Sequence, residues 1–425
     1  MASLAWMVNL KKGVAAAMLD MLYLSALNIR RNNRRSILTV LSIAVGCAAL
    51  ACFGAFISFS FEGLREITIH TQLGHMQIYR KGYWERHMSD PENAMIESVS
   101  DLDDALSGIE GVSSVAPRLT FSGIGGAGRN TATMFVMGID PEREIEFADF
   151  EIVTDGRPLM PGDIDAGVIG SELATGLDVS VGDWVTLLAS TLDGMINAVD
   201  FKVVGITRTG NTKYDSVFVK IPLGLAQSVL DTDSVERMVL LLHDTDSLEE
   251  MAPIIEEAAA NLPERYETRQ WKELAGFYSS VVSLYSGLFQ ILSGIVAVVV
   301  LFSVANTMTM AVFERTGETG ALRAIGASQG VVMTMFLTEG FLTGILGGGA
   351  GVILSLGVSH AVEILGGIAM PPPPSMSQGY QAYFPMHLDN LALAFLVSVV
   401  ASLASSVLPA WTASRTNIVE ALQVQ

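Results

Sequence analysis

Four long apolar stretches alternate with polar segments along this chain. They are residues 37–61, 284–313, 331–362 and 391–411. Each stretch reaches the roughly 20 residues that an α-helix needs to cross about 30 Å of hydrocarbon. The pattern therefore predicts a polytopic α-helical membrane protein with four transmembrane helices, at residues 36–61, 280–313, 330–363 and 389–411.

The long segment between the first and second apolar stretches has the character of a folded domain. Here short apolar runs alternate with turn residues, which predicts a large mixed α/β domain over residues 62–279. Strands are expected at residues 74–80, 131–140 and 237–244. Helices are expected to begin at Ser100, as the N-cap, and at Ser247. A β-rich insertion at about 156–230 separates these two strand–helix pairs, and the run GIGGAGRN at 123–130 predicts a flexible loop.

Composition and charge place this domain outside the membrane. The 425 residues are 50% hydrophobic and 16% charged, with a net charge of −19; a soluble chain carries about 25% charged residues. Residues 62–283 hold 16 basic against 37 acidic residues, a net charge of −21. Lys and Arg are instead concentrated beside the ends of the predicted spans, and the positive-inside rule places such ends in the cytoplasm. We therefore predict an extracytoplasmic domain and two cytoplasmic termini, and we exclude a wholly soluble enzyme and a nucleic-acid partner.

The remaining segments are assigned by their position relative to the spans. Residues 1–35 are expected to form a cytoplasmic amphipathic segment, 314–329 a cytoplasmic loop, 364–388 a periplasmic loop and 412–425 a cytoplasmic tail. Cys47 and Cys52 lie five residues apart in the first span, so they cannot pair with each other. A disulfide is not expected in the outer domain.

The third span carries two features that call for a role. Glu339 is an acid inside an apolar stretch, which by default suggests function, although a structural bond to a neighbouring helix is the alternative. Small residues allow close helix approach. Helix packing is therefore predicted for Gly340, Gly344, Gly347, Gly348 and Gly351.

The sequence offers no catalytic residue and no metal site. The histidines of the domain are scattered without ligand spacing, and the phosphate-binding pattern GxxxxGK[ST] does not occur in these 425 residues. We therefore expect no enzyme activity and no cofactor in this chain.

Three motifs carry a resemblance to a known family. They are FERTGETGALRAIGAS at residues 313–328, SALNIRRNNRRSILTVLSIAVG at 25–46 and LPAWTASRTNIVEAL at 408–422. Together they resemble the MacB/FtsX family of ABC transporter permeases. Within that family the chain looks most similar to the lipoprotein-releasing (Lol-type) permeases without a fused ATPase, through the runs GHMQIYRKGYWE at 74–85, GRPLMPGD at 156–163 and VGDWVTLL at 181–188. Thr319 and Asn417 depart from the residues usual in that family, isoleucine and proline.

The resemblance implies a mechanism and a set of partners. The permease would pair with a second copy or a paralogue in the bacterial inner membrane. Its 314–329 loop would bind a dimer of a separate cytoplasmic ABC ATPase, which holds the ATP and Mg²⁺. The expected ATPase-coupling residues are Glu314, Arg315, Glu318, Leu322, Arg323 and Ile325.

The family further implies mechanotransmission, in which a cytoplasmic stroke moves the periplasmic domain, with the second span as a rigid rod. The expected substrate is an amphiphile, a lipoprotein or lipid-like molecule, that is extracted or exported. The expected further partners are the membrane lipids and a periplasmic carrier or adaptor. The alternative is an FtsX-like signal transducer that regulates a periplasmic partner without transport.

Overall fold

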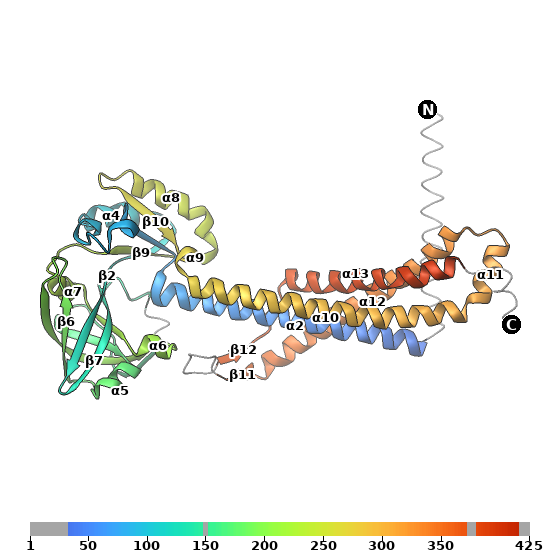
Figure 1. Cartoon of the computed structure of the whole chain (residues 1–425), viewed down its shortest axis with the longest axis horizontal. Helices are drawn as coiled ribbons and strands as arrows, with labels where there is room; N and C mark the ends of the chain where they lie inside the picture. The colour runs from blue at the N-terminus through green and yellow to red at the C-terminus, as the bar shows by residue number, and fades with distance from the viewer. Residues whose placement is uncertain (1–32, 148–151, 372–379, 416–425) are drawn as a thin grey trace, which may run out of the picture. The chain divides into compact units, whose positions relative to one another are not determined.

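The computed structural model describes residues 33–147, 152–371 and 380–415. The chain divides into two compact units (Figure 1). The helical unit contains Met1–Phe61, Ser283–Ala369 and Gln381–Gln425, and the α/β unit contains Glu62–Val282 and Met370–Tyr380. The predictions for residues 1–32, 372–379 and 416–425 lie outside the described residues.

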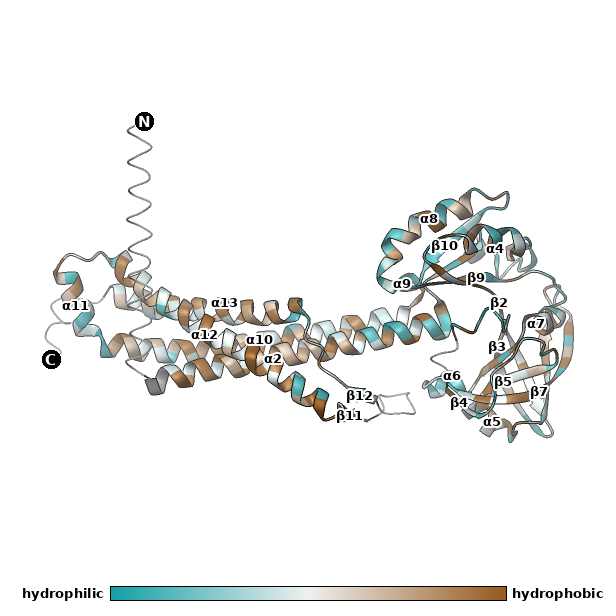
Figure 2. Ribbon diagram, turned by 180° about the vertical axis from the view of Figure 1, so that it is seen from behind, coloured by the Kyte–Doolittle hydropathy of each residue, from teal (hydrophilic) through white to brown (hydrophobic). Residues whose placement is uncertain are grey.

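Within the described ranges, four helices are long and apolar enough to cross a membrane, which confirms the predicted four-helix membrane protein. They are α2 (Asn33–Thr68), α10 (Gly276–Glu314), α12 (Gln329–Ile364) and α13 (Leu388–Ser414). Figure 2 shows their largely hydrophobic character. The helix α2 continues without a break into a π-helical turn, η1 (Ile69–Leu73).

Glycines of α12 lie where neighbouring helices come closest. A Cβ at Gly347 would lie 2.6 Å from the Cβ of Ile43 on α2, and one at Gly351 would lie 2.8 Å from the Ala44 main-chain oxygen. On another side of α12, Gly344 and Gly340 face Ser402 and Ser406 of α13, and Gly348 faces Phe395. Each of the five glycines that the sequence assigned to packing thus lies at an interhelical contact, where a side chain would push the helices apart.

The α/β unit contains a four-stranded antiparallel sheet covered by two helices. The strand order is β10 (Tyr266–Gln270), β1 (Met76–Arg80), β9 (Arg237–Leu242) and β2 (Val112–Ala127). The helices α4 (Val99–Ser107) and α8 (Leu248–Ala260) bury Leu102, Leu106 and Ile255 in one core with strand residues such as Met238. The order is that of a split β-α-β unit.

Six strands close into a barrel that shares β2 with this sheet. From β2 the ring runs through β3 (Asn130–Ile139), β8 (Phe218–Pro222), β5 (Ala166–Gly170), β7 (Ile196–Arg208) and β6 (Trp184–Ser190), and β6 pairs back to β2. The strand β4 (Ile152–Gly156) adds to β7. Three helices accompany the ring: α5 (Ser171–Leu177), α6 (Thr212–Asp215) and α7 (Leu223–Leu230). Phe201, Leu119 and Leu173 belong to its separate core.

Two local predictions about this unit are wrong. Helix α4 begins at Val99 with Ser98 at the N-cap, and no side chain caps it, so Ser100 lies inside the first turn. Residues 123–127 belong to β2 and only the next two form the turn to β3. The glycines serve close strand packing, because a Cβ at Gly123 would lie 2.7 Å from the main-chain oxygen of Leu188.

Candidate functional site

A short helix, α11 (Thr316–Ala324), connects the long apolar helices α10 and α12 along the chain, at the end of the helical unit (Figure 1). It follows α10 after one residue, Arg315, whose backbone leaves the helical region at φ −109° and ψ 19°. After α11 the chain turns at Gly326, with φ 110°, and α12 begins behind Ser328. The Ser328 hydroxyl caps α12 by accepting the Val331 N–H at 3.4 Å. These turns set α11 off from both long helices.

One face of α11 is exposed. Glu318, Leu322 and Ile325 follow one another at intervals of four and three residues, which places them on one side of a helix. The side chain of Ile325 is 86% exposed and that of Leu322 is 44% exposed. Glu314, the last residue of α10, and Glu318 are also exposed, and Arg323 is half-buried. This coupling face, Glu314, Glu318, Leu322 and Ile325, thus combines carboxylates with apolar side chains.

The opposite face of α11 is buried. Arg315 and Thr319 are 6% and 3% exposed. The Arg315 guanidinium donates from Nη1 to Oε2 of Glu339 on α12 at 3.0 Å, and Glu339 is itself 6% exposed. In this arrangement Arg315 does not reach the surface, unlike the other residues expected to contact a partner. Thr319 also points inward, so its departure from the usual isoleucine bears on packing and not on the coupling face.

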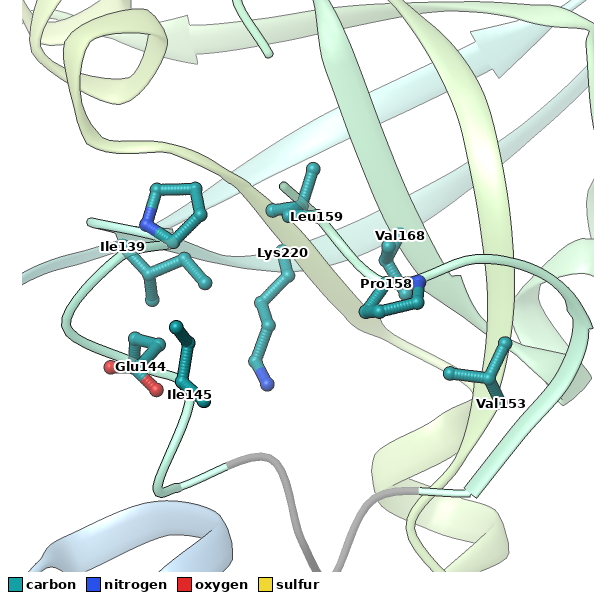
Figure 3. Close-up of a pocket in the computed structure, with 9 residues that line it drawn as sticks. Ile139, Glu144, Ile145, Val153, Pro158, Leu159, Val168 and Lys220 are labelled. Atoms are coloured by element: carbon teal, nitrogen blue, oxygen red, sulfur yellow. The ribbon is translucent and has the colours of Figure 1, made fainter. Parts of the chain in front are cut away.

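The α/β unit contains a cavity of about 270 Å³ that the sequence did not indicate. Figure 3 shows the Lys220 side chain extending between Glu144 and Ile145 on one side and Pro158 and Val153 on the other. The Glu144 carboxylate accepts two hydrogen bonds from Arg118, at 2.6 and 3.0 Å, so it is already engaged. Because its lining comes from four strands and two loops far apart in sequence, no spacing signal existed to find it.

The two helices that enter the α/β unit lead to neighbouring strands. The strand β1 follows α2 and η1, and β10 precedes α10; they pair in register, with Met76 opposite Gln270. Arg118 on β2 is fully buried and donates from Nη1 to the main-chain oxygen of Gln72 in η1 at 2.6 Å. Its guanidinium also lies 4.5 Å from the ring centroid of Phe147. No pattern in the sequence singles out Arg118.

An α/β unit between the first and second apolar helices, with a short charged helix between the second and third, defines a permease-type membrane subunit. The family of MacB-like periplasmic core domains matches residues 36–258, and the family of FtsX-like permease C-terminal domains matches residues 290–418. The chain therefore belongs to the MacB/FtsX family of ABC transporter permeases, as its motifs suggested. Its apolar helices and its family make it a bacterial inner-membrane protein.

Several proteins with different names are similar to this chain. The lipoprotein-releasing system transmembrane protein LolC of Xylella fastidiosa is 27% identical over 63% of this chain and 66% of that relative, just under two thirds of its length. The uncharacterized ABC transporter permease YknZ of Bacillus subtilis is 23% identical over 83% of this chain and 89% of its own. A macrolide export ATP-binding/permease protein MacB of Paracoccus denitrificans is 27% identical over 96% of this chain and 59% of its own.

Proposed function

We propose that this chain is the membrane subunit of an ATP-driven complex in which a separate cytoplasmic ATPase dimer binds the coupling face. The observation that carries the proposal is the exposure of Glu318, Leu322 and Ile325 on one side of α11, between two spans. ATP and Mg²⁺ belong to the partner, because these 425 residues hold no phosphate-loop motif.

The chemistry of the coupling face suits a protein partner. Burying a large aliphatic side chain such as Ile325 or Leu322 stabilises a complex by about 1.5–3 kcal/mol. Glu314 and Glu318 add charges that set the orientation of a partner with basic groups. Arg323, in the last turn of α11, is half-buried. Apolar anchors within a charged rim are the arrangement that gives an interface both affinity and register.

The proposed mechanism is mechanotransmission, in which a movement on the cytoplasmic side moves the periplasmic domain. Movement of α2 or α10 acts directly on the α/β unit, because β1 and β10 are adjacent strands of one sheet. The α/β unit then lies on the periplasmic side and both termini on the cytoplasmic side, in agreement with the charge distribution. A second copy or a paralogue is the expected neighbour of α10, whose apolar window is only 11% buried in one chain, against 50% for α2.

The proposed substrate is an amphiphile, a lipoprotein or lipid-like molecule, passed to a periplasmic carrier or adaptor. This part rests on the names of relatives such as LolC. The measurement is ATP-dependent release of a lipid-anchored protein from vesicles that contain the complex. Hydrolysis of ATP without release would contradict transport and favour the signalling alternative.

The test of the ATPase contact uses one apolar side chain. Ile325→Asp places a charge at the more exposed of the two apolar positions on the coupling face, and we expect about tenfold less ATPase to co-purify with the permease. Leu365→Asp is the matched control, because Leu365 is an 80% exposed apolar residue at the other end of α12. Equal recovery of the ATPase with Ile325→Asp and with Leu365→Asp would exclude the coupling face as the binding site.

A further inference from the structure

Two consecutive residues of α12, Glu339 and Gly340, make polar contacts with the end of α10 and with α13. Glu339 binds the guanidinium of Arg315 at the end of α10, with 3.0 Å between Nη1 and Oε2. The main-chain oxygen of Gly340 accepts the hydroxyl of Ser402 on α13 at 2.8 Å. The end of α10, α12 and α13 are therefore joined by polar contacts at one level of the bundle.

Arg315 is also the residue at which α10 turns into α11. Its N–H donates to the oxygen of Ala311 at 3.2 Å, within α10. Its own main-chain oxygen accepts the N–H of Thr319 at 2.9 Å, within α11. The main chain of Arg315 thus belongs to both helices, while its side chain is fixed to a third. A change of the angle between α10 and α11 would have to move this guanidinium.

We infer that Arg315 is a positioning residue, whose buried pair with Glu339 makes α11 move as one body with α12. Separating the two charges leaves the Glu339 carboxylate without the guanidinium in a low-dielectric site, so the bend at Arg315 resists opening. A stroke received by the coupling face is then delivered to α12 and α13 as well as along α10. This inference rests on the proposed function for its use, but the joint itself is a property of this chain.

The experiment measures the rigidity of the joint and ATPase binding in the same samples. Spin labels at Ala324 on α11 and Leu356 on α12, both exposed, report the distance between the two helices in full-length permease with Cys47→Ala and Cys52→Ala. We expect a narrow distance distribution in the parent, and one about twofold broader in Glu339→Gln, because the ion pair between α12 and Arg315 is lost. The charge exchange Arg315→Glu with Glu339→Arg should restore the narrow distribution.

The controls separate the joint from the coupling face. Glu363→Gln changes an exposed acid on the same helix, which lies 3.8 Å from His360, and should leave the distribution narrow. Ile325→Asp should lose the ATPase and keep the narrow distribution, whereas Glu339→Gln should keep the ATPase and broaden it. An unchanged width in Glu339→Gln would overturn the inference alone. Retention of the ATPase by Ile325→Asp would overturn the proposed contact alone.

Discussion

Arg118 donates a hydrogen bond of 2.6 Å to the main-chain oxygen of Gln72, and so ties the barrel strand β2 to the turn that ends the first membrane helix. Arg118 stands where β2 changes neighbours, opposite Arg237 on β9 and Ile139 on β3. The same guanidinium binds both oxygens of Glu144. One buried cation therefore connects the incoming helix, the four-stranded sheet and the barrel.

Removal of this cation should destabilise the α/β unit. Arg118→Met leaves the Glu144 carboxylate buried without its partner, and breaking such a pair costs about 3–5 kcal/mol. We expect this loss in the free energy of unfolding, measured by denaturant titration of the detergent-solubilised protein. Arg143→Met is the control: Arg143 pairs with Asp103 on the surface with 37% of its side chain exposed, and we expect about 1 kcal/mol or less. Equal losses from the two substitutions would contradict the role of burial.

The helical unit offers a matched pair of glycines. Gly347→Ala places a methyl group 2.6 Å from Ile43 Cβ, whereas a Cβ at Gly349 meets nothing within 4 Å. Overpacking of this kind costs about 1–3 kcal/mol, while alanine at an open helical position is favourable by about 1 kcal/mol. We expect a lower unfolding temperature for Gly347→Ala and an equal or higher one for Gly349→Ala. The opposite order would show that α2 and α12 are not packed as described.

Whether a feature can be predicted from the sequence depends on how far apart in the chain the interacting residues lie. The four spans follow from local hydropathy, and the glycines of α12 were singled out because small residues recur along one segment. The burial of Arg315 was missed because its partner, Glu339, lies 24 residues further on and no local pattern joins them. Arg118 was missed for the same reason: its partners Gln72 and Glu144 come from elements 46 and 26 residues away.

The wrong prediction of a loop at residues 123–130 has a different cause. Glycine-rich runs indicate flexibility only when nothing pairs with them, and here β3 and β6 do. Those pairings are set by the closure of the barrel, which period-2 patterning does not encode. Glycine at 123 admits the main chain of Leu188, so the same residues that suggest a loop are required by a tightly packed strand.

Charge reversal beside the coupling face tests the proposed ATPase contact independently of its apolar anchors. Arg323→Glu should lower ATPase co-purification by about tenfold, or leave the ATPase bound with its hydrolysis uncoupled, since a reversed charge at an interface opposes the partner's complementary group. Arg129→Glu in the exposed turn between β2 and β3 is the control for net charge. Normal assembly together with normal, coupled hydrolysis in Arg323→Glu would remove Arg323 from the contact.

The buried His75 predicts a pH dependence of stability. Burial lowers the pKa of His75 from 6.5 to about 4. The neighbouring His70 and Arg65 also lower this pKa, whereas Asp244 raises it. Its ring accepts the N–H of Leu242 at Nδ1 and meets the Thr245 hydroxyl at Nε2, at 3.1 and 2.9 Å. The neutral imidazole is therefore the form that the fold holds.

The sign follows from which state binds the proton. Between pH 6.5 and pH 4 the unfolded chain protonates His75 and the folded chain does not, so stability falls as the pH is lowered through this window, by up to roughly 3 kcal/mol. Unfolding titrations at pH 7.5 and pH 5 should show this fall in the parent protein and in His243→Gln, which changes an exposed histidine. His75→Gln should be less stable at pH 7.5 but lose less on acidification. The same fall in His75→Gln as in the parent would assign the pH dependence to other groups.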